Sequence, residues 1–375
     1  MSLTSAPTLR ERLTTPVLLA VLLGFLALSL GTLNLLKLQP AGVDFAGLWA
    51  GGKAALTDIG KLYDFHYVSE LQGWPLGPGK LRPYAYPPSA LLLLTPFALA
   101  PWNLSYIVWT LATGAFFVWA GVKAGAPKWF PLIPWVAFAA FCGQATFLLG
   151  GLVMAGLALT SSPIIAGVLF GCAAAMKPQL LMLLPLALIA ERRWTTIVAT
   201  GVTGLVLCAV SAAVFGLQPW FEWLGALSRF EYLVSHARLL VANAITPYAA
   251  LTYWRQEGSW ALLLAPGAAL WVWLTFRRGA DLSDKIIALF GGAFLISPYA
   301  MNYELALFAP ATAAYLARTR DPRWPAYAAA AVLQAIVLHP AFFSLAATLS
   351  LPLLKALPLP PFLGREPEAS LIRNG

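Results

Sequence analysis

The sequence predicts an all-helical protein that crosses a membrane many times, and three observations lead to this prediction. Hydrophobic residues make up 60% of the 375 residues, and charged residues only 10%. The mean hydropathy is +0.75. A soluble domain of this length needs many more charges to cover its surface. The apolar residues also fall into long runs between short polar segments, which is typical of a polytopic membrane protein.

The first apolar run, Pro16 to Leu36, has the roughly 20 uncharged residues that a membrane-spanning helix requires. The charged residues before it are Arg10, Glu11 and Arg12. No small-residue cleavage site follows at the right distance, so we expect a retained helix and not a signal peptide. Further apolar runs occur at about residues 86–100, 103–122, 131–143, 145–160, 164–176, 179–190, 195–215, 259–276, 285–299, 302–317, 325–339 and 341–357. Because several are shorter than a full span, we expect about 10 to 13 crossings, with some runs forming half-helices or re-entrant segments.

Basic residues predict the orientation of the chain, because Lys and Arg collect in short cytoplasmic loops. The segments expected in the cytoplasm are ERRW (191–194), FRRG (276–279), RTRDPRW (318–324) and the tail 358–375. The segments expected on the opposite side are the loop 37–85, the segment 216–257 and the turns 177–178 and 299–303. If the loop 37–85 and the turn at 177 lie on the same side, the chain between them must cross the membrane an even number of times. Five apolar runs occur between them. Either one run is re-entrant, or 131–160 contains a single span.

The formal net charge of +9 does not indicate a nucleic-acid-binding protein. The basic residues occur in short clusters between apolar runs and form no stripe interleaved with aromatic residues. The three cysteines lie inside apolar runs without a CxxC pair, which predicts buried thiols. The three histidines are spread too widely along the chain to suggest a metal site, and no Asp-x-Asp pair occurs in the outer loop. We therefore expect no metal ion and no cofactor.

The loop 37–85 is predicted to carry two short helices. The sequence DFAGLWAGGKAAL (44–56) has apolar residues at helical spacing, which favours an amphipathic helix at the bilayer surface. Asp44 would cap this helix or lie in its first turn, where the helix dipole favours a carboxylate. The sequence LYDFHYVSELQ (62–72) predicts a second helix, capped by Asp64.

Acidic residues are scarce, and none occurs between Glu70 and Glu191. Of the carboxylates expected on the outer side, Asp44 and Glu304 lie directly against the ends of apolar runs, where a carboxylate is costly unless it is paired or used. Asp44 has two interpretations, which are compatible with each other. One is a helix cap, and the other is a general base that takes a proton from a hydroxyl nucleophile.

Two polar turns also interrupt the apolar runs. Lys177 is followed by Pro178, which breaks the helix and leaves an ammonium group beside free backbone groups. The lysine is either an interface residue or a partner for an anion such as a lipid phosphate. The turn SPYAMNYE (297–304) has more hydrogen-bonding groups than lipid-facing structure tolerates, so it is either an interfacial aromatic belt or a set of sugar or phosphate contacts.

In combination, these motifs resemble glycosyltransferase family 87, the polyprenol-phosphate-mannose-dependent alpha-mannosyltransferases of the GT-C superfamily. The resemblance is carried by VDFAGLWAGGKAAL followed by KLYD, by YAYPPSALLLLTPFALAP, by GQATFLLGGL, by AAAMKPQLLMLLPLALIAERRW and by LISPYAMNYELALFAP, and it runs from about residue 40 to 315. It implies a single GT-C domain over 1–375 with interfacial helices in the first extracytoplasmic loop. It also implies an inverting sugar transfer, with mannose expected as the sugar, from a polyprenyl-phosphate donor to a lipid or glycan acceptor, in the bacterial inner membrane. The histidine that family members often carry in the turn at 297–304 is missing here.

The resemblance places the catalytic aspartate at Asp44 and puts Lys177 near the donor phosphate. Arg82 and Lys80 are further candidates for the phosphate. The expected sugar or acceptor contacts are Trp49, Tyr84, Tyr86, Gln179, Tyr299, Asn302, Tyr303 and Glu304. The alternatives are a carrier or flippase for a polyprenyl-linked sugar and a non-catalytic assembly protein. A carrier predicts charges near mid-span and internal pseudo-symmetry, and the sequence indicates neither.

Overall fold

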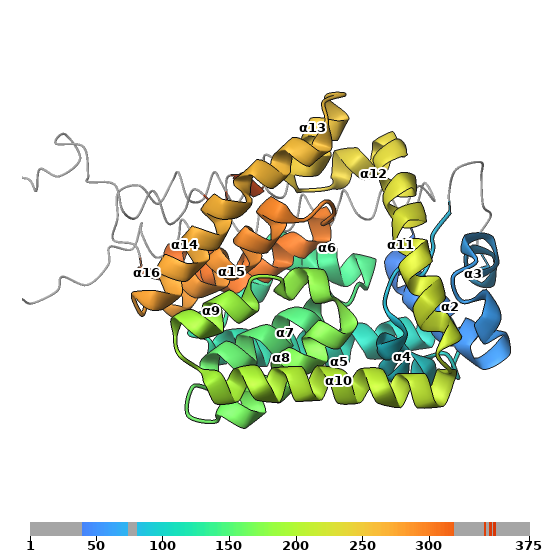
Figure 1. The fold of residues 1–375 in the computed structure, drawn as a ribbon, viewed down its shortest axis with the longest axis horizontal. Helices are drawn as coiled ribbons and strands as arrows, with labels where there is room; N and C mark the ends of the chain where they lie inside the picture. The colour runs from blue at the N-terminus through green and yellow to red at the C-terminus, as the bar shows by residue number, and fades with distance from the viewer. Residues whose placement is uncertain (1–39, 74–80, 319–340, 343–344, 347, 350–375) are drawn as a thin grey trace, which may run out of the picture.

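The fold is described from a computed structural model, in which residues 40–73, 81–318, 341–342, 345–346 and 348–349 are described. All regular elements in these residues are helices (Figure 1). Extended backbone pairs within them only at an isolated antiparallel bridge between Ala244 and Met301. The predicted all-helical character is therefore confirmed for this part of the chain. The predicted first span, the tail 358–375, the run 325–339 and most of the run 341–357 lie outside the described residues.

The helices follow the predicted apolar runs closely. The loop that precedes residue 86 contains α2 (Val43–Thr57), η1 (Ile59–Lys61) and α3 (Phe65–Leu71). The central part contains η2 (Pro88–Ala90), α4 (Leu91–Phe97), α5 (Trp102–Lys123), η3 (Phe130–Leu132), α6 (Pro134–Cys142), α7 (Thr146–Ala158), α8 (Pro163–Met176), η4 (Pro178–Leu181), α9 (Leu184–Ala190) and α10 (Trp194–Phe215). The last part contains α11 (Gln218–His236), α12 (Arg238–Asn243), α13 (Pro247–Tyr253), η5 (Gly258–Leu264), α14 (Ala265–Arg277), α15 (Leu282–Ile296), η6 (Asn302–Phe308) and α16 (Ala309–Arg318).

Three helices in the described residues are long and apolar enough to cross a membrane. They are Trp102–Lys123, Trp194–Phe215 and Gly258–Arg277. Shorter apolar helices are Pro88–Phe97, Thr146–Ala158, Pro163–Met176 and Pro178–Ala190. These elements support a helical membrane protein in which several apolar runs form short or interrupted helices.

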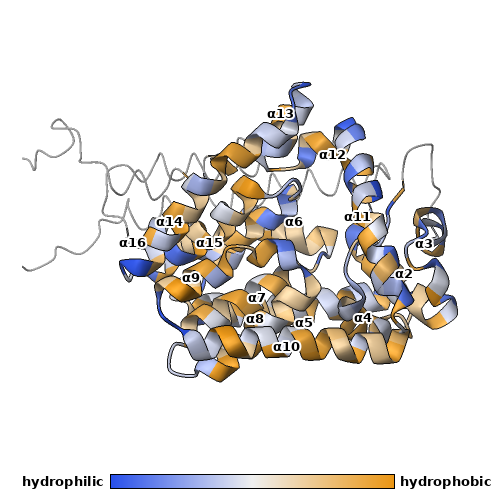
Figure 2. Cartoon of the chain, viewed as in Figure 1, coloured by the Kyte–Doolittle hydropathy of each residue, from blue (hydrophilic) through white to orange (hydrophobic). Residues whose placement is uncertain are grey.

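The exposure of α10 indicates a lipid-facing helix. Only Thr196 and Ser211 of its residues are buried. In contrast, Leu205 is 72% exposed and Val198 is 64% exposed. The helix forms the lower edge of the molecule in Figure 1, and apolar residues recur along its whole length in Figure 2. A continuous apolar surface of this extent is stable against lipid and not against water.

Small residues let α8 approach the opposite side of α10. A Cβ atom added at Gly167 would lie 2.4 Å from the Cβ of Ala199 and 2.7 Å from the carbonyl oxygen of Thr196. A Cβ atom added at Gly171 would lie 2.5 Å from the Cβ of Thr203. Two glycines four residues apart therefore bring the two backbones into contact, as is common between membrane helices.

The run 131–160 is not a continuous span. The helix α6 ends at Cys142, the backbone turns at Gly143 with a φ of 73°, and α7 begins at Thr146. A Cβ atom at Gly143 would lie 2.8 Å from the Cβ of Phe45 in α2. The break therefore brings the start of α2 directly against the end of α6.

The predicted helix over 44–56 forms, but the prediction that it is amphipathic is wrong. The residues of α2 that are buried lie on all sides of the helix: Val43, Phe45, Ala46, Leu48, Ala50, Gly51, Gly52 and Ala54. Gly51 packs against the ring of Tyr84, and Gly52 packs against the backbone of Leu94. The small residues of α2 thus let neighbouring parts of the chain pack closely around the helix. The second predicted helix is confirmed as α3, and Asp64 caps it by accepting hydrogen bonds from the backbone N–H groups of His66 and Tyr67.

The contact between α8 and α10 can be tested with two glycine-to-alanine variants. Gly167→Ala is expected to destabilise the protein by about 1–3 kcal/mol, because the added methyl group meets backbone atoms that cannot move aside. The matched variant Gly201→Ala in α10 meets no atom within 4 Å. It is expected to be neutral or stabilising by up to about 1 kcal/mol, because alanine favours helix. Thermal unfolding of the two purified variants in detergent measures the difference, and equal midpoints would contradict this packing.

Candidate active site

The start of α2 holds Asp44 in a fixed place. Gly42 precedes the helix with a φ of 76°, and its N–H donates a hydrogen bond of 2.7 Å to the carbonyl of Phe141. A Cβ atom at Gly42 would lie 2.9 Å from the ring of Tyr106. Asp44 lies in the first turn of α2 and is half-buried. The N-cap position is Gly42, so the expected placement in the first turn is confirmed and the cap interpretation is not.

Asp44 borders a cavity of about 180 Å³. The lining residues come from six separate parts of the chain: 43–48, 81–87, 144, 176–179, 227–240 and 299–303. All of these parts except Gln144 lie in, or within two residues of, the segments that the basic-residue pattern assigned to one side of the membrane. The prediction that these segments lie together is therefore consistent with the cavity they share.

Burial and two neighbours set the acidity of Asp44. Removal from water raises its pKa from 3.8 to about 6, although a hydrogen bond with the thiol of Cys142 and the positive charge of Arg82 both act to lower it. The carboxyl group is therefore largely ionised at neutral pH and accepts a proton readily. Burial also lowers the pKa of Arg82, and the charge of Asp44 opposes that shift.

Arg82 belongs to an extended segment that crosses the cavity. Its N–H donates to the Ser69 hydroxyl at 2.9 Å, and its carbonyl accepts from the Gln72 amide at 2.8 Å. Both partners lie at the end of α3, so these two bonds attach the segment to α3. Trp223 of α11 donates from its indole N–H to the carbonyl of Ala85 at 3.3 Å, which holds the same segment from the other side.

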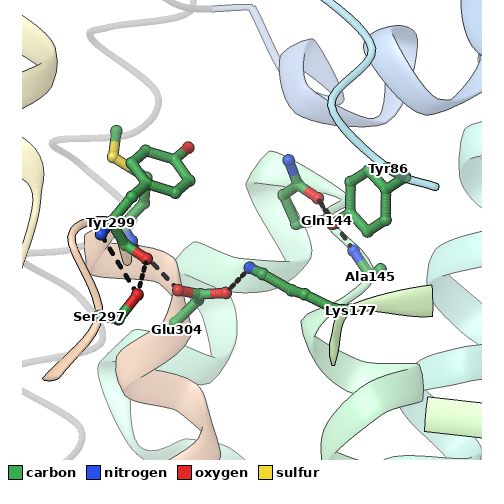
Figure 3. A network of polar contacts seen from close by, with 8 residues as sticks. Tyr86, Gln144, Ala145, Lys177, Ser297, Tyr299 and Glu304 are labelled. Atoms are coloured by element: carbon green, nitrogen blue, oxygen red, sulfur yellow. Dashed lines mark hydrogen bonds and ion pairs between the residues drawn. The ribbon is translucent and has the colours of Figure 1, made fainter. Parts of the chain in front are cut away.

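A buried ion pair joins the two predicted polar turns. Lys177 follows α8, and its ammonium group donates to a carboxylate oxygen of Glu304 in η6 (Figure 3). The side chains are only 8% and 2% exposed. The second carboxylate oxygen of Glu304 accepts from the N–H of Met301 at 3.2 Å. The hydroxyl of Ser297 donates to the carbonyl of Tyr299 at 2.8 Å and so closes the preceding turn.

Tyrosine hydroxyls provide most of the remaining polar lining. Tyr86 donates to the side-chain oxygen of Gln144 at 2.9 Å (Figure 3). Tyr84 donates to the carbonyl of Pro87 at 3.3 Å. Burial raises the pKa of both groups well above the usual value for tyrosine, so both stay neutral. The ring of Tyr299 packs edge-on against Phe230 of α11, with centroids 5.3 Å apart.

The cavity unites most of the residues that the sequence singled out. Those that line it are Asp44, Arg82, Tyr84, Tyr86, Lys177, Gln179, Tyr299 and Tyr303. Three others are not among its lining residues. Trp49 donates to the carbonyl of Ala100 at 2.9 Å, Asn302 contacts the amide oxygen of Asn243 at 3.4 Å, and Glu304 lies behind Lys177. Lys80 lies outside the described residues.

Sequence reasoning missed two parts of this site. Cys142 and Gln144 flank the helix break at Gly143, and the signal for Gln144 is a single amide inside a long apolar stretch. The other part is the apolar wall that α11 and α12 provide, formed by Leu227, Phe230, Leu233, Val234 and Leu240. The recurrence of apolar residues at 227, 230 and 234 follows helical spacing and could have indicated this wall. Among the described residues, no three His, Cys, Asp or Glu side chains lie close enough together to hold a metal ion.

Comparisons with known proteins agree with this picture. The sequence model of glycosyltransferase family 87 matches residues 84–298. A polyprenol-phosphate-mannose-dependent alpha-(1-2)-phosphatidylinositol pentamannoside mannosyltransferase of Mycolicibacterium smegmatis is 26% identical over 320 residues, which cover 69% of this chain and 74% of that protein. A protein of the same name from Mycobacterium tuberculosis is 34% identical over 118 residues, which cover 30% of this chain and 26% of that protein. No solved structure matches the chain.

The ion pair between Lys177 and Glu304 makes a prediction about stability. Lys177→Met and Glu304→Gln, made singly, are each expected to destabilise the protein by about 3–5 kcal/mol, because each leaves a buried charge without its partner. The double variant is expected to recover most of that loss, because it leaves neither charge. Unfolding of the three purified variants in detergent measures these differences. Additive losses in the double variant would show that the two side chains do not act as a pair.

Proposed function

The chain belongs to glycosyltransferase family 87 and is a glycosyltransferase, and from this we propose that it transfers mannose from a polyprenyl-phosphate donor to a hydroxyl group of a lipid or glycan acceptor. The observation that carries the proposal is the cavity in which Asp44, Arg82 and Lys177 meet. The names of both relatives describe polyprenol-phosphate-mannose-dependent mannosyltransferases and include a phosphatidylinositol pentamannoside, which supports the donor and a glycolipid as the class of acceptor.

Asp44 is proposed as the general base. The acceptor hydroxyl oxygen attacks the anomeric carbon of the donor sugar, and its proton passes to the Asp44 carboxylate. The bond between the anomeric carbon and the phosphate oxygen breaks, the electron pair leaves with the polyprenyl phosphate, and the anomeric centre inverts. The pKa of about 6 supports this role, because the carboxylate is then ionised at neutral pH and still basic enough to accept the proton.

Arg82 and Lys177 are proposed to stabilise the charge that develops on the departing phosphate. An ammonium group has three N–H donors, so Lys177 can donate to a phosphate oxygen while it remains paired with Glu304. Arg82 brings a planar guanidinium group that suits a phosphate. Because these two cations provide the positive charge, the proposed step uses no metal ion. The tyrosines at 84, 86, 299 and 303 are proposed to contact the sugar through their hydroxyls and rings.

The apolar wall of α11 and α12 is the proposed path of the polyprenyl chain. Leu227 and Phe230 line the cavity, and farther along the same helix Leu224 and Phe221 are 59% and 71% exposed. An apolar surface that runs from the cavity to the outside of the molecule suits a donor that arrives within the bilayer. This path would place the sugar phosphate at the polar end, near the two cations.

We also propose the topology that the sequence predicted: one GT-C domain with about 10 to 13 crossings, and a cavity that opens on the extracytoplasmic side of the bacterial inner membrane. Two features support this orientation. The basic segments 191–194 and 276–279 contribute no lining residue to the cavity, and Glu191 of the first segment pairs with Lys285 at 2.7 Å. In Figure 1, α10 runs from α9 to α11, so the loop after α9 and the cavity wall lie at opposite ends of a spanning helix.

Replacement of Asp44 tests the general base. Asp44→Asn is expected to lower the transfer rate by about 10²- to 10⁴-fold, because the amide cannot accept the proton. Transfer of radiolabelled mannose from polyprenyl-phosphate-mannose to membrane lipids and glycans measures the rate. As a control for folding, the variant should unfold at no lower a temperature than the wild type, since burial disfavours the ionised carboxylate above a pH of about 6. A folded variant with normal transfer would rule out this role.

The acidity of Asp44 predicts a pH dependence. The kcat/KM for the acceptor is expected to rise with pH up to about 6 and to level off above it, because only the ionised form accepts the proton. Cys142→Ala removes a hydrogen bond that lowers this pKa. The variant is therefore expected to shift the rising limb of the pH profile of kcat/KM to higher pH. Cys142→Ser keeps a donor and should leave the limb closer to its original position. A profile without a limb in this range would contradict the assignment.

A further inference from the structure

A second cavity region adjoins the reaction cavity between α3 and α11. Leu81 lines the reaction cavity and also lines two further cavities of about 530 Å³ and about 580 Å³. Leu233 is likewise shared by the reaction cavity and the larger one. Both volumes lie within the roughly 300–1,000 Å³ that is usual for small-molecule sites. The region is therefore an open surface next to the reaction cavity, with space for a further part of a ligand.

The first of these cavities is lined by charged side chains of both signs. Asp64 and His66 at the start of α3 face Glu222 and Arg229 of α11 across it. Arg229 is exposed, donates weakly to the carbonyl of Tyr63 at 3.5 Å and lies 5.3 Å from the ring centroid of Phe65. A surface with carboxylates and a guanidinium group together offers both acceptors and donors of hydrogen bonds. Such a mixture suits a neutral ligand with many hydroxyl groups better than it suits a polyanion.

The second cavity adds aromatic rings to these polar groups. Phe65 and Tyr232 line it, and Tyr232 is 65% exposed. The ring of Tyr232 stacks on His236, with centroids 3.9 Å apart, so the exposed tyrosine is held in place. Exposed aromatic faces beside hydrogen-bonding groups match the two surfaces of a sugar, which has an apolar C–H face and a rim of hydroxyls.

The polar region and the apolar wall lie on different sides of α11. The wall through Leu227 and Phe230 leads from the reaction cavity toward exposed leucine and phenylalanine side chains. The region at Leu81 leads instead toward Asp64, Glu222 and Arg229. A lipid chain would leave these charges without a partner, which is costly. The two routes from the reaction cavity are therefore chemically distinct.

We propose that the region between α3 and α11 binds the carbohydrate part of the acceptor, and that it holds at least one sugar beyond the sugar that carries the attacking hydroxyl. This inference rests on the proposed transfer reaction for the identity of its ligand as the acceptor. Arg229 and Tyr232 are the two residues assigned to this added contact. They donate hydrogen bonds and offer a ring face, respectively, and neither one lines the reaction cavity.

Binding without the donor tests this inference separately from catalysis. The full-length wild-type protein in detergent is titrated by calorimetry with methyl α-mannoside, methyl α-dimannoside and methyl α-trimannoside. The affinity is expected to rise by about tenfold or more from the monosaccharide to the longer probes, because the added sugars make new hydrogen bonds with the protein. Arg229→Ala and Tyr232→Ala are each expected to weaken trimannoside binding by about tenfold and to leave monosaccharide binding unchanged.

Matched variants outside these cavities provide the controls. Arg238→Ala removes the same charge from a residue that lines none of these three cavities, and Trp260→Ala removes an aromatic ring that is 60% exposed and likewise lines none of them. Neither should change trimannoside affinity. Affinity that does not depend on the number of sugars, or that falls equally in the control variants, would overturn the inference. Binding with the expected pattern but no mannose transfer from the donor would instead refute the proposed function and support a carbohydrate site.

Discussion

The arrangement of the site depends on the buried ion pair between Lys177 and Glu304. Either charge alone would be strongly unfavourable in this interior, whereas the two together are tolerated. The pair joins residues 127 positions apart, so the helix break after α8 and the turn before η6 are held in contact. The same carboxylate accepts from the N–H of Met301, which extends the constraint to the turn that carries Tyr299. One interaction thus positions a cation and a tyrosine on the same side of the cavity.

The opposite side of the cavity is built by close backbone contact and not by charge. Gly42 and Gly143 both have positive φ values and bring the start of α2 against the end of α6. Asp44 therefore projects from a helix that is enclosed by the protein and cannot shift as a surface helix could. In its proposed role as the base, a carboxylate fixed in this way needs little reordering when the acceptor binds. The rigid carboxylate faces Arg82, whose segment is attached to α3 and to α11 on its two sides.

Much of the local structure follows from the sequence, because it depends on near neighbours. The all-helical character, the helix break at Lys177 and Pro178 and the cap at Asp64 are examples. Long-range contacts could not be predicted in the same way. The burial of α2 depends on how Gly51 meets Tyr84, a contact that helical periodicity does not encode. Glu304 was expected to contact the substrate. Its ion pair with Lys177 could not be predicted, because the two residues lie far apart in the sequence and meet only in the folded structure. The lining of the cavity by α11 also requires the tertiary fold.

The pKa of Asp44 also bears on how the site returns to its starting state. A carboxyl group with a pKa of about 6 holds a proton only weakly at neutral pH. In the proposed transfer, Asp44 would therefore pass the hydroxyl proton on to water in the cavity that it borders. A carboxyl group with a much higher pKa would retain the proton and block the next turnover. The burial that makes the proposed base more basic thus also sets how readily it loses the proton after each transfer.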